Sequence, residues 1–307
     1  MRILLRFGYI GDLITAIESS KSLGLPLYYA PDYLSFLCPW WRREHYRAAL
    51  QNASLLSQKL GHPVHQVNLG TLRRLNLTTN SYEVLLLAQT PTRWSALLVI
   101  AIRILLGIRA SVLYDGAQWF YSALSRNNMK VRKHFAELPI TSQLNVCINW
   151  DAKEEVKNLS AKTISTVVSI IRSRFSCATI TIIGKEHCNV ELEGVSNVSG
   201  QVALRKALEL VDSADLLVTC DTGPLHYAAA RGIWTVAFVA ARYPLAIWYP
   251  FSEYVAVVSD LLVDCRQLKC AQCSFVKNVC VNGNEPLVYF AALFQTTNTQ
   301  TLTHPES

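Results

Sequence analysis

The chain has 307 residues, of which 51% are hydrophobic and 17% charged, so it can bury a large core and is not a disordered protein. Its length is sufficient for two α/β domains. The net charge of +7 is uneven: residues 1–138 hold 16 Lys and Arg against 7 Asp and Glu, whereas residues 139–307 hold 13 against 15. A basic amino-terminal half indicates an anionic partner or simply a solvated basic face. Nucleic acid is not expected, because no nucleic-acid-binding motif is present.

The amino terminus is expected to form a strand, a glycine-containing turn and a helix. Residues 2–7 predict the strand, and a helical pattern covers residues 13–23. The turn between them, Gly8-Tyr9-Ile10-Gly11-Asp12, is not Gly-x-Gly-x-x-Gly, so a dinucleotide cofactor is not indicated. By itself the Gly11-Asp12 turn is a weak signal, and Asp12 could be only a helix cap.

Two segments of the amino-terminal half have compositions that raise the question of membrane contact. Residues 96–108 are the most apolar stretch but are too short to span a bilayer, and we expect a buried core helix there. Residues 39–43, Pro-Trp-Trp-Arg-Arg, combine aromatic and basic side chains and could help the protein rest on a membrane surface. The first residues do not follow the order of a signal peptide, so a cytoplasmic protein is expected.

The second half alternates strands and helices, which predicts a parallel sheet. The boundary is expected near residues 138–142, which gives domains of residues 1–138 and 139–307. Ser160 is expected to cap the first helix of this half. The expected strands cover residues 144–150, 179–183, 216–218 and 235–239, and the expected helices cover residues 160–172 and 202–211. The polar end, from about residue 296, is expected to fray.

Residues 221–224, Asp-Thr-Gly-Pro, lie between a short apolar strand and a helix of small residues that ends at Gly232. This turn places a carboxylate, a hydroxyl and backbone N–H groups at a helix start, where a phosphate binds well. Three interpretations remain open: a structural helix cap, half of an aspartic protease site, or a nucleotide-sugar site. The protease would need a second Asp-Thr-Gly, and the sequence contains none.

The stretch from Ser213 to Gly232 resembles glycosyltransferase family 9, the heptosyltransferases of bacterial lipopolysaccharide synthesis. Its Asp-Thr-Gly-Pro turn, the following His226 and the alanine-rich helix carry the likeness, and the Gly11-Asp12 turn after the first strand supports it. The resemblance implies an α/β protein of the GT-B fold, with two Rossmann-like domains facing across a cleft. Residues 1–138 would form the acceptor side and residues 139–307 the nucleotide-sugar side.

The resemblance also implies an inverting sugar transfer, with heptose from ADP-heptose as the expected donor. The expected acceptor is a lipopolysaccharide core, another anionic glycolipid, a glycan or a protein. Two alternatives remain: a non-catalytic nucleotide-sugar-binding or assembly protein, and another GT-B enzyme such as a sugar-nucleotide epimerase. Two loops depart from the family, because residues 151–160 lack the usual Pro-Gly start and residues 240–244 lack a glycine. In the second loop Arg242 could supply the missing phosphate donor.

Site residues are carried over from the family position by position. Asp12 matches the proposed general base, and no catalytic metal is expected. A cation in the loop after the first strand of the second half would stabilise the leaving diphosphate. Lys157 is the best match and Lys153 the second, while an ordinary surface lysine remains the alternative. His226 is either a donor ligand or a core histidine. The expected donor-binding residues are Gly11, Lys157, Asp221, Thr222, Gly223, Pro224 and His226.

Four of the nine cysteines form the pattern Cys265-x4-Cys270-x2-Cys273-x6-Cys280 in a loop at residues 265–280. Four thiolates from one loop suit a structural zinc or iron ion. Some family relatives that glycosylate autotransporters carry a similar cysteine-bound iron finger; four unligated thiols are the alternative. The remaining cysteines are expected to be buried apolar residues: Cys38, Cys147, Cys177, Cys188 and Cys220.

Overall fold

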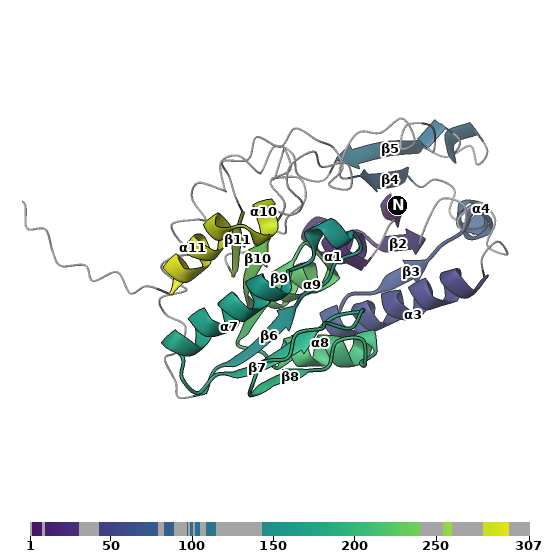
Figure 1. The fold of residues 1–307 in the computed structure, drawn as a ribbon. Helices are drawn as coiled ribbons and strands as arrows, with labels where there is room; N and C mark the ends of the chain where they lie inside the picture. The colour runs from purple at the N-terminus through teal and green to yellow at the C-terminus, as the bar shows by residue number, and fades with distance from the viewer. Residues whose placement is uncertain are drawn as a thin grey trace, which may run out of the picture.

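The structure is a computed structural model of the chain, which forms two parallel β-sheets with helices on both faces (Figure 1). It describes residues 2–7, 10–30, 43–78, 83–88, 97, 99–100, 102–104, 109–114, 143–239, 254–259 and 279–294. The expected boundary at residues 138–142 lies outside these ranges.

The first sheet has the strand order β3-β2-β1-β4-β5, with every neighbouring pair parallel. Its central strand is the expected one and is buried on both faces, as a parallel sheet covered by helices requires. The strands are β1 (Arg2–Phe7), β2 (Leu27–Ala30), β3 (Val64–Gln66), β4 (Glu83–Ala88) and β5 (Arg109–Tyr114).

Alternating residues of β1 face two layers of helices. Leu4 packs with α1 (Ile10–Leu23) and α3 (Arg43–Leu60). Ile3 and Leu5 face the opposite way, toward α4 (Leu69–Thr78). This two-residue period places Arg2, Leu4 and Arg6 on one face of the strand, so that Arg6 points to the side that carries α1.

The second sheet has the order β11-β10-β9-β6-β7-β8, again with parallel neighbours. One face packs on α7 (Ala161–Arg174), α10 (Val279–Asn282) and α11 (Asn284–Leu293). The other face packs on α8 (Leu204–Asp212) and α9 (Gly223–Arg231). The strands are β6 (Asn145–Asn149), β7 (Thr179–Ile183), β8 (Val195–Asn197), β9 (Leu216–Cys220), β10 (Trp234–Phe238) and β11 (Val255–Val258).

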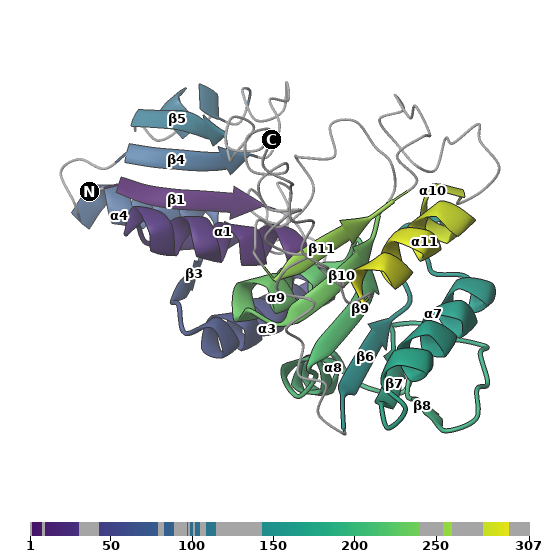
Figure 2. The same cartoon turned by 90° about the vertical axis from the view of Figure 1, so that its left-hand side faces the viewer.

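The two halves meet where α1 packs against α9, and Figure 2 shows both helices between the sheets. Leu13 and Ile17 of α1 share an apolar cluster with Tyr227 and Ala228 of α9. The small alanine side chains of α9 allow this close approach. The contact brings the start of α1 near the start of α9, and these are the two helix starts that carry the candidate site residues.

Two expectations about burial are wrong. Within residues 96–108, Val99 and Ile102 are buried, but Leu97, Ile100 and Ile104 are exposed by 54%, 48% and 75%, so the segment is not a buried core helix. Of the residues described there, Val99 and Ile102 pack in the cluster on one face of the first sheet, whereas Leu97, Ile100 and Ile104 lie on the exposed side. Cys177 is exposed, whereas Cys147, Cys188 and Cys220 are buried as expected. Among the described helices, none is both long and apolar enough to cross a membrane.

Candidate active site

Asp12 lies in the first turn of α1, next to the carboxyl end of β1. The guanidinium of Arg6 donates from Nη2 to Asp12 Oδ1 at 2.6 Å. The Arg6 side chain is buried and that of Asp12 is partly exposed, so the arginine holds the carboxylate at the edge of the protein surface. Gly11 belongs to the same helix turn. Sequence reasoning missed Arg6; the available signal was an arginine inside an apolar strand, where a buried charge needs a partner.

The turn from Asp221 to Pro224 connects β9 to α9 as expected. Thr222 is the N-cap residue, with extended backbone at φ −144° and ψ 174°, but its side chain makes no cap bond to the helix. Pro224 lies in the first turn, and Gly232 ends the helix at φ 68°. Since the Thr222 hydroxyl does not cap α9, the structural-cap interpretation of this turn loses its main support.

Lys157 ends the short 3₁₀ helix η1 (Glu155–Lys157) between β6 and α7. It is largely buried, and Nζ donates to Asp221 Oδ2 at 2.9 Å, with Glu154 Oε1 at 3.8 Å. The structure therefore brings the preferred lysine to the Asp-Thr-Gly turn. A buried ion pair of this kind places one positive charge beside the start of α9.

Asn149 is a second residue that sequence reasoning missed. It ends β6, is buried, and its Nδ2 lies 3.2 Å from Thr222 Oγ1, 3.3 Å from Thr219 Oγ1 and 3.2 Å from the carbonyl oxygen of Asp151. The amide has two hydrogens, so these three contacts share them. The amide thereby ties the loop after β6 to the turn after β9. The available signal was a polar residue near the end of the strand predicted at residues 144–150.

His226 lies in α9, one turn from Thr222, and is buried. Its Nδ1 has no hydrogen-bond partner among the residues that the structure describes. Burial lowers the pKa of His226 below its ordinary value, and the carboxylates of Asp221 and Asp12 oppose that shift. His226 therefore experiences the charges of both halves, and the imidazole is neutral at pH 7.

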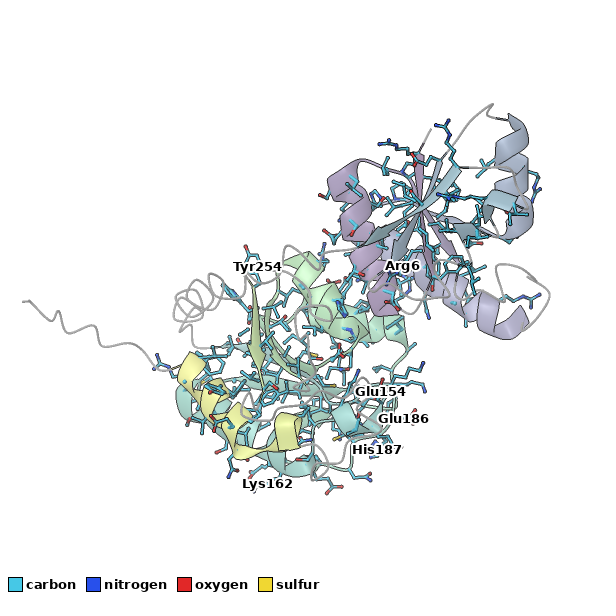
Figure 3. The ribbon with its side chains drawn as sticks, turned by 90° about the horizontal axis from the view of Figure 1, so that it is seen from above. Arg6, Glu154, Lys162, Glu186, His187 and Tyr254 are labelled. Carbon is cyan, nitrogen blue, oxygen red and sulfur yellow. The ribbon has the colours of Figure 1, made fainter. Side chains whose placement is uncertain are left out.

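Arg6, Asp12, Lys157, Asp221 and His226 form one polar group at the junction of the two sheets. Figure 3 shows Arg6 where the first sheet approaches the helices of the second. The group contains a carboxylate held by arginine, a lysine beside a helix start and a neutral imidazole. This combination can bind an anion and accept a proton next to it.

The described residues do not test the expected metal site. Cys265, Cys270 and Cys273 lie outside the described residues, and Cys280 is placed in α10 only by its backbone. Among the described side chains, no group of three or more His, Cys, Asp or Glu residues could hold a metal ion.

Comparison with known proteins supplies independent findings. Residues 178–276 match glycosyltransferase family 9 (heptosyltransferase). ADP-heptose lps heptosyltransferase II of E. coli shares 14% identity, with 95% of this chain and 98% of that chain covered and a TM-score of 0.52. A glycosyl transferase family 9 protein from Veillonella parvula shares 13% identity, with 95% and 97% covered and a TM-score of 0.56.

A third structure is the dodecameric iron-containing heptosyltransferase TibC in complex with ADP-D-beta-D-heptose. It shares 14% identity, with 95% of this chain and 76% of that chain covered and a TM-score of 0.47. Among proteins with curated descriptions, none matches the chain.

The two parallel sheets, together with the likeness to the E. coli and Veillonella parvula structures, define the class of fold, the GT-B fold that those glycosyltransferases share. Within that class, the resemblance to family 9, the heptosyltransferases, is confirmed by the match over residues 178–276. That segment contains Asp221, Thr222 and His226, so the turn between β9 and α9 lies within the matched region.

Proposed function

We propose that the chain transfers heptose from ADP-heptose to an anionic acceptor, with inversion at the sugar carbon. The observation that carries the proposal is the Lys157 Nζ to Asp221 Oδ2 contact of 2.9 Å at the start of α9. It unites a cation and a helix N-terminus, the two groups that favour a diphosphate. The relatives described as heptosyltransferases support heptose as the sugar.

The donor diphosphate would lie over the first turn of α9. Backbone N–H groups of Gly223 and Leu225 would point to it, since Pro224 between them has none, and Lys157 would shift from Asp221 toward its oxygens. The negative charge of the leaving nucleoside diphosphate rises as the sugar departs, so a fixed cation lowers the barrier. In this account Thr222 shapes the turn through its contact with Asn149.

The acceptor would approach from the first half, with Asp12 as the general base. The acceptor oxygen forms a bond to C1 of the heptose while the bond from C1 to the diphosphate oxygen breaks. Asp12 takes the proton of the acceptor hydroxyl, and ADP leaves with the electron pair of the broken bond. Arg6 would keep the carboxylate of Asp12 directed toward the acceptor, as their 2.6 Å contact permits.

His226 would contribute its open Nδ1 to the donor. The neutral imidazole can present an N–H to a phosphate or sugar oxygen, and burial strengthens such a bond by excluding water. Since the pKa of His226 is lowered, the ring does this without carrying a charge at pH 7.

We also propose where the protein works. The acceptor would be a lipopolysaccharide core or another glycolipid, glycan or protein, presented in the cytoplasm at the inner face of the membrane. The exposed apolar side chains of Leu97, Ile100 and Ile104, together with the basic charge of residues 1–138, support a peripheral membrane contact. The cysteines of residues 265–280 would hold a structural zinc or iron ion and no catalytic one.

A thermal-shift series tests the donor class. ADP and ADP-heptose should raise the melting temperature of the wild-type protein, because a ligand that binds only the folded state stabilises it. UDP and GDP serve as matched comparisons of equal charge. A larger shift with UDP or GDP than with ADP would contradict the proposed donor, and no shift with any diphosphate would contradict the site.

A further inference from the structure

Asn282, the last residue of α10, reaches back to the segment between β6 and α7. Its Oδ1 accepts hydrogen bonds from Ser160 N at 2.7 Å and Thr163 Oγ1 at 2.7 Å. Its Nδ2 donates to the carbonyl oxygen of Asn158 at 2.9 Å. A backbone N–H can only donate and a carbonyl can only accept, so the partners fix the orientation of the amide.

One half of this contact completes the start of α7. Ser160 is the N-cap, and its Oγ accepts from Thr163 N at 3.1 Å. In a capping box the third helical residue, a Glu or Gln, returns a bond to the N-cap N–H. Here that position is Thr163, whose side chain is too short. Asn282 supplies the missing acceptor from 122 residues away.

The other half of the contact holds the loop that carries Lys157. Asn158 is fixed on two sides, because its Oδ1 accepts from Ala152 N at 2.7 Å and its carbonyl accepts from Asn282. Leu159 N then donates to Trp150 O at 2.8 Å and closes the loop. Lys157 is the residue directly before Asn158, so the direction of its backbone depends on this anchor.

We propose that Asn282 is a positioning residue for Lys157. By holding the carbonyl of Asn158, it keeps Nζ of Lys157 at the start of α9, where the donor diphosphate would bind. The inference rests on the proposed function, in which Lys157 contacts the diphosphate. Asn282 acts through Asn158, so its effect should appear in donor affinity and should require Lys157.

The test is calorimetric titration of the full chain with ADP. Asn282→Asp retains both acceptor contacts but replaces the donor to Asn158 with an oxygen. We expect ADP to bind about three- to tenfold more weakly, the effect of one lost hydrogen bond. The melting temperature should also fall, because a carboxylate oxygen then faces the carbonyl oxygen of Asn158 where a hydrogen bond was, although the negative charge near the start of α7 offsets part of this loss.

Thr163→Val is the matched control. It removes a contact to Asn282 Oδ1 without touching Asn158. It should lower the melting temperature and leave the affinity for ADP unchanged. A loss of affinity equal to that of Asn282→Asp would overturn the inference, because the start of α7 would then be responsible.

A double-mutant cycle adds a measurement of ADP affinity that a general destabilisation of the fold would not change. In the Lys157→Ala background, Asn282→Asp should cause no further loss of ADP affinity, because the group it positions is absent. Additive losses would overturn the inference. If Asn282→Asp does not fold, Asn282→Ala takes its place in the same cycle.

Two failures remain distinguishable. If Lys157→Ala weakens ADP binding and folded Asn282→Asp does not, the inference is wrong and the proposed donor site stands. If Lys157→Ala itself binds ADP as the wild type does, the proposed donor site is wrong, and the inference falls with it.

Discussion

Lys59 Nζ lies 2.6 Å from Asp212 Oδ2, and this ion pair joins α3 beside the first sheet to the end of α8 beside the second. The second oxygen of Asp212 accepts from Tyr227 OH at 2.7 Å and from Arg231 Nε at 3.2 Å. One carboxylate therefore links the two halves next to the apolar contact of α1 with α9, and it should contribute to stability.

Asp212→Asn should lower the free energy of unfolding by about 1 to 3 kcal/mol at pH 7, because three partners lose a charged acceptor. Burial alone would raise the pKa of Asp212, but hydrogen bonds from Lys59 and Tyr227 outweigh it and lower the pKa. The stability from a lowered carboxyl pKa is present above the unfolded value of 3.8 and is lost as the pH falls through the folded value.

Urea unfolding of wild type and Asp212→Asn at several pH values checks this. The difference between the two proteins should be full at pH 7 and should shrink as the pH falls below 3.8. A difference that stays constant down to pH 2 would show that the carboxylate charge plays no part in joining the halves.

Asp12→Asn should reduce sugar transfer by about 10²- to 10⁴-fold, because the general base is removed. The substitution keeps the volume of the side chain and lies in α1, away from Lys157, so ADP affinity should change little. Transfer is measured with labelled donor, and affinity by titration with ADP. Near wild-type turnover would remove Asp12 from the mechanism.

Lys157→Ala should weaken ADP binding by about tenfold or more, because charge-assisted contacts to phosphate are among the strong hydrogen bonds. Thr222→Ala should also weaken it, since the turn loses its contact with Asn149. Lys153→Ala, an exposed lysine four residues earlier, is the matched control and should bind ADP as the wild type does. Equal loss in Lys157→Ala and Lys153→Ala would indicate a general effect of positive charge.

The sequence predicted five of the eleven described strands, because their apolar and β-branched runs are local features. Residues 2–7, 179–183 and 216–218 match β1, β7 and the first three residues of β9. The cap at Ser160 was predictable for the same reason, since its acceptor and donor lie three residues apart. Gly232 also appears as expected, at a helix end with positive φ.

The contacts that assemble the site could not be predicted in the same way. Asn149 meets Thr222 across 73 residues, and Lys157 meets Asp221 across 64. Such contacts depend on the order of strands in the sheet, which local patterns do not contain. The place of Lys157 in the loop after a predicted strand did indicate that this lysine lies at the site. Loops at the carboxyl ends of neighbouring parallel strands lie together.

The cysteine segment gives a prediction for the metal. The purified protein should contain about one zinc or iron ion per chain, bound by Cys265, Cys270, Cys273 and Cys280. Cys270→Ser should lose the metal and lower the melting temperature, because a metal supplies folding energy to a loop with little core.

The matched control is Cys177→Ser, at an exposed cysteine outside that segment, which should retain the metal. Elemental analysis and thiol titration measure both effects. A metal-free protein of full stability, with all four thiols freely titratable, would contradict the metal site.

The most direct test of the account is transfer of radiolabelled heptose from ADP-heptose to an isolated lipopolysaccharide-core acceptor. We predict labelled product and one ADP released per sugar transferred by the wild type, and almost none of either with Asp12→Asn. ADP release that does not depend on an acceptor would contradict the assignment of this site to sugar transfer, and binding of ADP-heptose without any transfer by the wild type would contradict the lipopolysaccharide core as its acceptor.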